Sequence, residues 1–180
     1  MFKSTAQKDK ETFEALKEKF GYTNPNQAPH IEKVVVSSGV GSITDKNKLK
    51  LIGEKMALIT GQKPASQNAK KSIAQFKVRE GQLAGYRSTL RGANAYGFLD
   101  KVINIAFPRT RDFRGVSKDS VDEMGNYSFG IKEHTIFPET ADEELRNVFG
   151  FSVTIVTTSN SKEETLALLE HIGIPFKKEE

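Results

Sequence analysis

The sequence of 180 residues contains no cysteine, which excludes a disulfide framework and a thiolate metal site. It also lacks long apolar runs, since no stretch approaches the roughly 18 to 20 apolar residues of a membrane-spanning helix. The N-terminal stretch MFKSTAQKDKETFEAL has no apolar segment of the kind found in signal peptides. We therefore expect a soluble intracellular protein without a membrane partner, long enough to bury a core of its own.

Recognisable catalytic and metal-binding patterns are missing as well. The three histidines, His30, His134 and His171, are scattered and do not show the HxxxH or HExxH spacing of metal sites. The segment SSGVGS at 37–42 lies where a dinucleotide-binding loop would lie, but the third glycine of that fingerprint is replaced by Thr44. We interpret its glycines as a tight turn beside a ligand or another backbone segment. No catalytic residue, metal or cofactor is predicted. The alternative is a nucleotide-using or phosphotransfer enzyme built on SSGVGS.

What the sequence does contain is an uneven distribution of charge. Residues 63–114 hold eleven Lys and Arg against three acids, a net charge of +8, whereas the remaining residues sum to −4. Within this part, the segment KKSIAQFKVREGQLAGYRSTLRG at 70–92 has six basic residues and one acid. A basic centre between mildly acidic ends is typical of a surface that faces a polyanion, most often a nucleic acid.

Hydrophobic periodicity predicts a mixture of helices and strands. The expected helices cover 4–21, 49–61, 96–107 and 161–172. The first and last open with the capping boxes Ser4/Gln7 and Ser161/Glu164. The expected strands are the β-branched run 31–37 and the alternating segments 86–91, 127–132 and 151–156. Because the helices are amphipathic and the strands one-sided, we predict one α+β domain over 1–180, a largely antiparallel sheet with helices packed on one face.

The other face of the sheet is predicted to be open and polar. In the segment 86–91, Arg87, Thr89 and Arg91 alternate with residues that suit a core, so they point away from it. By the same alternation, the open face also carries Ser128, Lys132, Ser152 and Thr154. Such a face is a poor core but a good platform for the phosphates and 2′-hydroxyls of RNA.

Two basic loops strengthen this prediction. Residues from about 72 to 85 do not form a clean helix and are typical of an exposed basic arm, in which Phe76 stacks on a partner or anchors the arm. The segment PRTRDFRG at 108–115 places three arginines around Phe113: Arg109, Arg111 and Arg114. Arginine-rich loops with aromatics suit structured RNA better than lipid, since no basic amphipathic helix is present.

The strings KKSIAQFKVREG, TLRG, RTRDFRG and GNYSFGIKEHTIFPE, in this order and at these distances, resemble the family of bacterial large-subunit ribosomal protein five. The resemblance runs from about Pro29 to the final helix. It implies a structural constituent of the large ribosomal subunit that binds 5S rRNA and helps to attach it in the central protuberance. It also implies contacts with 23S rRNA, P-site tRNA, small-subunit ribosomal protein thirteen across the subunit interface, and neighbouring proteins of the central protuberance, in the cytoplasm.

The resemblance assigns site residues position by position. The rRNA-binding positions that it implies are Ser37, Gln62, Lys63, Thr89 and Arg91, and Arg87 joins them from the same strand face. The family loop that meets tRNA matches the arm, where we expect contacts from Lys77, Arg79 and Gly81. The loop 109–125 is the expected contact with the small subunit.

One position departs from the family pattern. The family usually reads Asn-x-Gly-Val-Gly where this chain has Ser37 followed by Ser-Gly-Val-Gly. Serine is shorter and offers one hydroxyl in place of an amide, which predicts a weaker or water-mediated RNA contact. A third hypothesis, an RNA chaperone acting away from the ribosome, shares the basic features, and co-sedimentation with large subunits distinguishes it.

Overall fold

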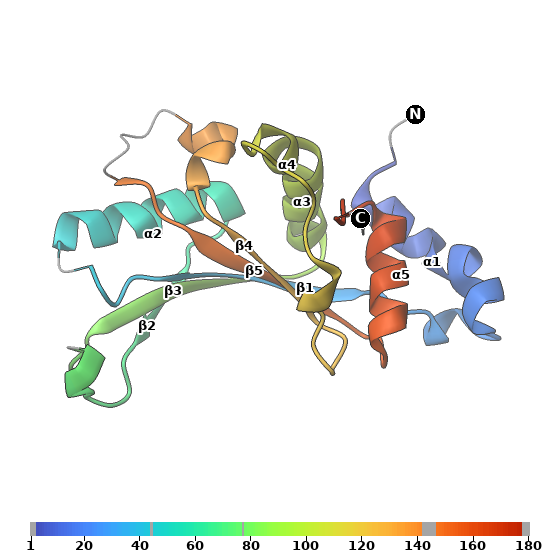
Figure 1. The fold of residues 1–180 in the computed structure, drawn as a ribbon, viewed down its shortest axis with the longest axis horizontal. Helices are drawn as coiled ribbons and strands as arrows, with labels where there is room; N and C mark the ends of the chain where they lie inside the picture. Colours follow the sequence, from blue (N-terminus) through green and yellow to red (C-terminus); the bar gives the residue numbers. More distant parts are fainter. Residues whose placement is uncertain (1–2, 44, 77, 142–146, 178–180) are drawn as a thin grey trace. The chain divides into compact units, whose positions relative to one another are not determined.

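The computed structural model of the chain describes residues 3–43, 45–76, 78–141 and 147–177. Its strands form a five-stranded antiparallel sheet in the order β2-β3-β1-β5-β4 (Figure 1). The strands are β1 (Ile31–Gly39), β2 (Ala65–Asn68), β3 (Leu83–Leu90), β4 (Tyr127–Ile131) and β5 (Phe151–Thr157). The α-helices are α1 (Thr5–Phe20), α2 (Lys46–Thr60), α3 (Ala93–Lys101), α4 (Phe107–Arg109) and α5 (Lys162–Ile172). This combination confirms the predicted α+β class.

The chain divides into two compact units that alternate along the sequence. One comprises Met1–Val34, Arg91–Phe129 and Thr154–Glu180, and we call it the terminal unit. The other comprises Val35–Leu90 and Gly130–Val153, and we call it the arm unit. Strands β1, β4 and β5 contribute residues to both units.

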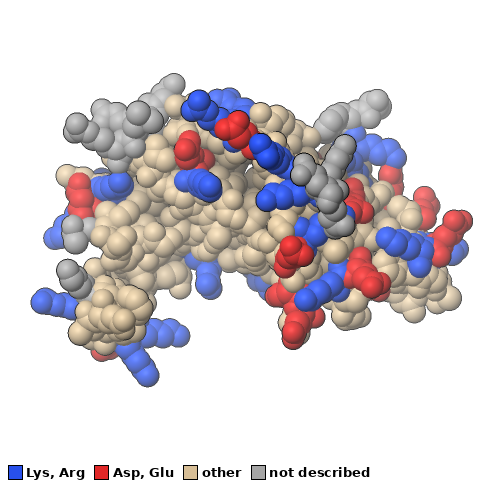
Figure 2. Space-filling model, viewed as in Figure 1, with Lys and Arg blue, Asp and Glu red and all other residues tan. Residues whose placement is uncertain are grey.

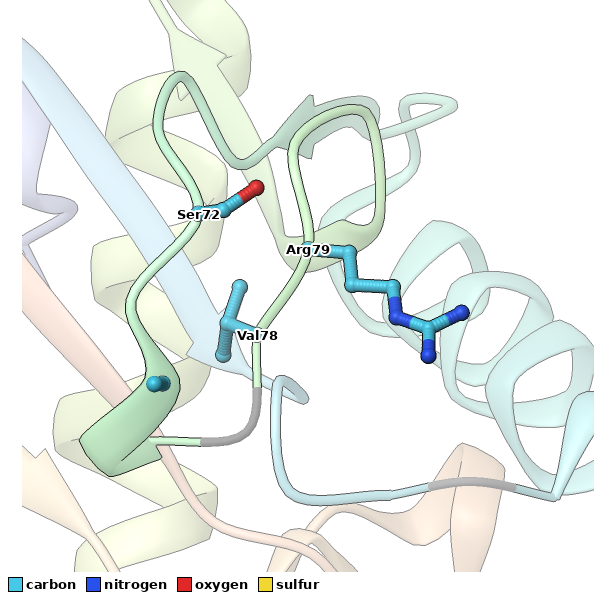
Figure 3. A pocket seen from close by; sticks show the side chains of 4 residues that line it. Ser72, Val78 and Arg79 are labelled. Carbon is cyan, nitrogen blue, oxygen red and sulfur yellow. The ribbon is translucent and has the colours of Figure 1, made fainter.

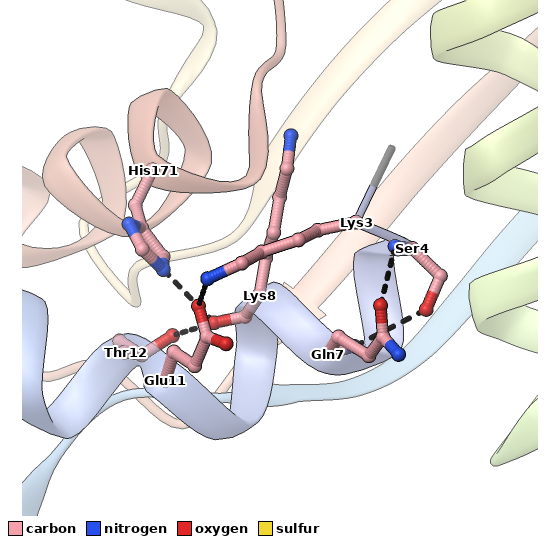
Figure 4. Close-up of polar contacts among 7 residues, drawn as sticks. All are labelled: Lys3, Ser4, Gln7, Lys8, Glu11, Thr12 and His171. Carbon is pink, nitrogen blue, oxygen red and sulfur yellow. Dashed lines mark hydrogen bonds and ion pairs between the residues drawn. The ribbon is translucent and has the colours of Figure 1, made fainter. Parts of the chain in front are cut away.

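The first helix of the terminal unit begins and ends where its sequence predicts. The Ser4 side chain accepts a hydrogen bond from the Gln7 N–H, and the Gln7 side chain accepts one from the Ser4 N–H (Figure 4). This reciprocal pair satisfies donors that the first turn of a helix leaves unpaired. At the other end, Gly21 closes the helix with a φ of 70°, a conformation that glycine adopts without strain. Both predicted ends of α1 are confirmed.

Within the terminal unit, α1 lies beside α5 and is joined to it by polar bonds. The Lys8 ammonium donates to the Ile172 carbonyl at 2.6 Å, and His171 Nε2 lies 2.9 Å from the Lys8 carbonyl (Figure 4). A buried cluster of Leu16, Tyr22, Ala28 and Ala167 also joins these two helices, and Phe13 and Phe20 pack against it. The N-terminal and C-terminal helices therefore fold as one layer.

In the arm unit, α2 supplies the apolar layer that packs against the sheet. Ile52, Met56 and Ile59 are buried, as their helical spacing predicts. Gly53 lies against Tyr86 of β3, because a Cβ on this glycine would be 3.2 Å from the Tyr86 ring. Gly61 ends the helix with a φ of 68°, again as predicted. The inward face of β3 is thereby covered by α2.

Several details of the secondary structure differ from the prediction: α2 begins at Lys46 instead of residue 49, and strand β2 was not predicted. The helix after β3 does not end before Pro108: a π-helical segment, Val102–Ala106, leads into α4, which includes Pro108 in its first turn. Strand β3 begins at Leu83, so the exposed loop before it ends at residue 82. None of these differences alters the fold class.

Candidate nucleic-acid interface

The two faces of β3 differ as the sequence predicts. Ser88 and Leu90 are buried, whereas Arg87 is exposed and Thr89 is half-buried on the opposite side. Strand β2 extends this polar face at the edge of the sheet, with Ala65 paired to Arg87 in an antiparallel register. All four residues of β2 are exposed. The arm unit therefore presents polar groups on the sheet face that α2 leaves uncovered.

Ser37 lies on this face in the middle of the sheet and is paired with a residue that the sequence analysis did not connect to it. Its Oγ lies 2.9 Å from Ser152 Oγ of β5, which also donates to the Ser37 carbonyl at 3.3 Å. A hydroxyl has one proton and two lone pairs, so a pair of hydroxyls keeps free acceptor sites. The pair can accept a hydrogen bond from a 2′-hydroxyl of RNA. It thereby replaces part of the hydrogen-bonding capacity of an asparagine side chain.

Gln62 and Lys63 lie between the end of α2 and the start of β2, and both side chains are exposed. Their backbone is fixed by the Thr60 hydroxyl, which donates to the Gln62 carbonyl at 2.9 Å, and by Pro64, which is buried. Two residues later, Ala65 pairs with Arg87. Because the strands are antiparallel, this register directs Lys63 toward the end of β3 that carries Thr89.

Arg91 follows the last residue of β3 and is exposed. It begins the middle segment of the terminal unit, Arg91–Phe129, one position before Gly92, the N-cap of α3. The structure thus places five of the six predicted rRNA-binding residues in the arm unit: Ser37, Gln62, Lys63, Arg87 and Thr89. The sixth, Arg91, directly follows β3 in the chain.

The glycine-rich segment SSGVGS contains the end of β1, through Gly39, and a turn that follows it beside β3. The N–H of Val40 donates to the Ala84 carbonyl at 2.9 Å, and the N–H of Ile43 donates to the Val40 carbonyl at 2.9 Å. These donors are therefore engaged by the chain itself and are not available to cradle a phosphate. The close approach is made possible by Gly85, since a Cβ there would lie 2.9 Å from the Ser38 carbonyl oxygen. The sequence predicted a tight turn beside a ligand or another backbone segment, and the structure shows the backbone segment, at Ala84.

The loop between β2 and β3 covers residues 69–82 and is closed by its own backbone. It replaces the predicted bounds of the arm, about 72 to 85, and we call residues 69–82 the arm. At its base, the Ala69 N–H donates to the Gln82 carbonyl at 2.8 Å and the Gly81 N–H to the Ala69 carbonyl at 3.0 Å. Nearer the tip, Ile73 and Val78 form an antiparallel bridge. Gly81, with a φ of 79°, lies in the turn in which the Gln82 N–H bonds the Arg79 carbonyl. The described residues of the arm therefore form a hairpin that is closed by their own backbone bonds.

The tip of the arm exposes apolar side chains among basic ones. Phe76 is 68% exposed and Ile73 is 46% exposed, so neither anchors the arm to the rest of the chain. Ser72, Val78 and Arg79 line an open depression, and the Arg79 guanidinium points away from the other two side chains (Figure 3). Lys77, a predicted tRNA contact, lies outside the described residues. Basic side chains project from the arm in several directions (Figure 2).

The segment 109–125 of the terminal unit has two parts of opposite charge. The first contains Arg109, Arg111 and Arg114 against a single acid, Asp112, and all four side chains are exposed. Phe113 of this part is not presented to a partner, because its ring stacks on Phe107 at 4.9 Å.

The second part, 117–125, contains three exposed acids: Asp119, Asp122 and Glu123. Asp122 holds its turn by accepting from the Asn126 side chain at 2.9 Å and from the N–H groups of Asn126 and Met124. These bonds, led by that to the Asn126 side chain, lower the pKa of Asp122 below its ordinary value. Met124 at the turn is 75% exposed.

The described residues contain neither a cluster of metal ligands nor a membrane-spanning helix. Across them, no three side chains of the metal-ligating types lie close enough together to hold an ion. In the same part of the chain, none of the helices combines the length and hydropathy that crossing a bilayer requires. The polar sheet face and the two basic loops are therefore the candidate binding surfaces of the chain.

Comparison with known proteins identifies the family of the chain. Residues 24–79 match the family described as ribosomal protein L5, and residues 83–176 match the C-terminus of the same ribosomal protein family. A large ribosomal subunit protein uL5 from Rubrobacter xylanophilus is 50% identical over 164 residues, covering 91% of each chain. One from Alkaliphilus metalliredigens is 47% identical over 165 residues, covering 91% of this chain and 92% of the relative. The chain therefore belongs to the ribosomal protein L5 family, a structural constituent of the large ribosomal subunit and not an enzyme.

Proposed function

We propose that the chain binds 5S rRNA through the polar sheet face of the arm unit and helps to attach it in the central protuberance. The observation that carries this proposal is the one-sided burial of β3, which leaves Arg87 and Thr89 uncovered beside the Ser37–Ser152 pair. Hydroxyl and guanidinium groups on a sheet suit the phosphates and 2′-hydroxyls of folded RNA. Gln62, Lys63 and Arg91 extend the surface at its edges.

We propose that the arm has a separate role, in which it contacts P-site tRNA. Arg79 is exposed, and Gly81 lies in the turn at the base of the arm, with Lys77 as the further expected contact. A hairpin with basic side chains is suited to a folded RNA surface that is read by charge and shape. The backbone bonds that close the hairpin around Arg79 and Gly81 support this proposal.

The remaining partners follow from the family. We propose contacts with 23S rRNA, with neighbouring proteins of the central protuberance, and with small-subunit ribosomal protein thirteen as part of an inter-subunit bridge. For the bridge, the acidic part of the segment 109–125 is the better candidate for contact with a protein, since it combines exposed carboxylates with the exposed Met124.

The sheet-face assignment is tested with the double variant Thr89→Ala/Arg91→Ala. Both side chains lie off the core, so the fold should persist while the affinity for 5S rRNA falls by about 1–3 kcal/mol, the range for a lost hydrogen bond to a charged group or its unpaired partner. Binding is measured at matched salt, with Lys10→Ala, an exposed cation of α1, as control. Unchanged 5S rRNA affinity in the double variant would show that this face is not the binding surface.

A further inference from the structure

The arginine-rich loop of the terminal unit is held rigidly in place, although its side chains are exposed. The Val116 N–H donates to the Pro175 carbonyl at 2.9 Å, and the Lys177 N–H donates to the Val116 carbonyl at 2.9 Å. Together these bonds form a parallel bridge between Val116 and Phe176 of the C-terminal segment. The loop is thus tied on one side to the end of the chain.

Further contacts fix the other side of the loop. Phe113 stacks on Phe107 with ring centroids 4.9 Å apart, and the Thr110 hydroxyl donates to the Ala106 carbonyl at 3.0 Å. Gly115 has a φ of 94°, and a Cβ there would lie 2.6 Å from the backbone of Phe176. Asp112 also has a positive φ, 53°, which is uncommon for a residue other than glycine. A backbone of this kind persists only where its surroundings hold it, and such positions often mark functional sites.

The three arginines on this braced loop are not neutralised by the chain. Within the described residues, no carboxylate lies within ion-pairing distance of Arg109, Arg111 or Arg114. Each guanidinium is a planar fork that stays charged and can bind two oxygens of one phosphate. A fixed backbone lowers the entropy lost when such side chains bind a partner.

The loop offers an RNA backbone more than it offers a protein. The hot spots of protein interfaces are mostly Trp, Tyr and Arg side chains packed in desolvated pockets, and the aromatic ring that could build such a pocket here is already used in the stack with Phe107. What the loop exposes is three guanidinium groups and one carboxylate within six residues. Three exposed guanidinium groups so close together can bind neighbouring phosphates of an RNA backbone.

We propose that residues 109–115 form a phosphate-binding surface for structured rRNA, additional to the sheet face of the arm unit. It rests on the proposed function only in that the partner is ribosomal RNA, either 5S rRNA or another rRNA of the large subunit. The sheet face then supplies hydroxyl and edge contacts, while this loop supplies charge.

The test compares variants of the full chain that lose equal charge in different places. Arg109→Ala/Arg111→Ala/Arg114→Ala removes three cations from the loop. The control, Lys10→Ala/Lys17→Ala/Lys19→Ala, removes three exposed cations from α1. Affinity is measured over a range of salt concentrations for two RNAs, 5S rRNA alone and protein-free 23S rRNA, and thermal unfolding confirms the fold of each variant.

For the RNA that the loop binds, the arginine variant should lower the slope of log affinity against log salt by about 2 to 3, since each neutralised phosphate contributes close to 0.9. The α1 control should change that slope by less than about 1. Replacing the three arginines with lysine should keep the slope but weaken binding several-fold, because lysine retains charge without the fork.

The same assay separates failure of this inference from failure of the sheet-face assignment. If the loop variant behaves like the α1 control with both RNAs, the inference is overturned, whatever Thr89→Ala/Arg91→Ala does. If the loop variant binds both RNAs normally but loses purified small-subunit ribosomal protein thirteen, the loop is a protein surface and the inference is also overturned.

Discussion

Gly85 and Gly97 show how one substitution can have opposite consequences at two places in the same fold. Gly85 lies in β3, where an added Cβ would be 2.9 Å from the Ser38 carbonyl oxygen of β1. This distance is too short for contact with a rigid backbone, so the two strands would have to move apart. Gly97 lies in α3, is exposed, and has nothing within 4 Å of an added Cβ.

We therefore predict that Gly85→Ala lowers the free energy of unfolding by about 1–3 kcal/mol, the usual cost of overpacking. Gly97→Ala should raise it by about 0.5–1 kcal/mol, because alanine is the better helix former. Guanidinium-chloride unfolding of the two variants beside wild type measures both changes. A Gly85→Ala protein as stable as wild type would mean that β1 and β3 can separate without loss.

Phe76 is the residue through which the arm can add stacking to its charge. It is 68% exposed at the tip of a hairpin, so the chain itself gains little from an aromatic ring there. Stacking of a base on an aromatic ring contributes about 1–3 kcal/mol and does not depend on counterion release.

We predict that Phe76→Ala speeds tRNA dissociation from ribosomes carrying the variant by roughly tenfold, and that the factor is equal at low and high salt. Phe76→Tyr keeps a stacking ring and should dissociate like wild type. Dissociation is measured with labelled P-site tRNA at two salt concentrations. Equal rates for all three proteins would show that the ring has no RNA partner.

Helices α1 and α5 are joined by a hydrogen bond that depends on a neutral tyrosine. The hydroxyl of Tyr22, just beyond α1, donates to Glu164 in the first turn of α5 at 3.0 Å. The Glu164 carboxylate also accepts from the Asn160 N–H, so the predicted capping box with Ser161 forms only in its first half. Burial, together with the hydrogen bond to Glu164 and its charge, raises the pKa of Tyr22 from 10.0 to about 12.

This shift predicts a loss of stability in alkali. Because the pKa of Tyr22 is higher in the folded chain, its contribution is fully present below pH 10 and is lost as the pH rises toward 12. Burial also raises the pKa of Tyr127 to about 12, which adds to the effect. Denaturant unfolding between pH 9 and 12 should show a steeper fall for wild type than for Tyr22→Phe. Identical pH profiles would mean that Tyr22 titrates alike in both states.

The helices were predictable where the sequence itself carries the stop signals. Ser4, Gly21 and Gly61 set helix ends through local hydrogen bonds and positive φ, and the structure has those ends. Strand β2 was not predicted, because its residues ASQN are all exposed and show no apolar alternation. The π-helical segment before Pro108 was missed for a related reason, since a shift of one residue in the hydrogen-bonding leaves little trace in a helical apolar pattern.

The candidate site was predictable to the same extent. Alternation along β3 placed Arg87 and Thr89 on the open face, and the structure has them there. It did not pair Ser37 with Ser152, because these residues are far apart in the sequence and strand order is a tertiary property. The division of the segment 109–125 into a basic and an acidic part is visible in the amino-acid sequence itself. The brace by the C-terminal segment was not, since it depends on the pairing of Val116 with Phe176.

Across the chain, the proposed RNA contacts are distributed so that separate tasks can be removed separately. The arm, residues 69–82, closes on its own backbone bonds, and its exposed Arg79 contributes nothing to the core. Thr89 lies on the strand that follows, on the polar sheet face. A loss of charge at the arm therefore leaves that face intact, and a change on the face leaves the arm closed.

We predict that Lys71→Ala/Arg79→Ala, which removes two exposed cations of the arm, gives large subunits with normal 5S rRNA content but faster loss of P-site tRNA. Thr89→Ala/Arg91→Ala should do the reverse, lowering 5S rRNA content while the remaining complete particles hold tRNA normally. Both quantities are measured in the same purified ribosomes, with Lys10→Ala/Lys19→Ala on α1 as a control for the loss of two charges. The tRNA effect of the arm variant should shrink at high salt, because it arises from released counterions. Should the arm variant instead lose 5S rRNA and keep tRNA, the arm anchors rRNA, and the two tasks are assigned to the wrong surfaces.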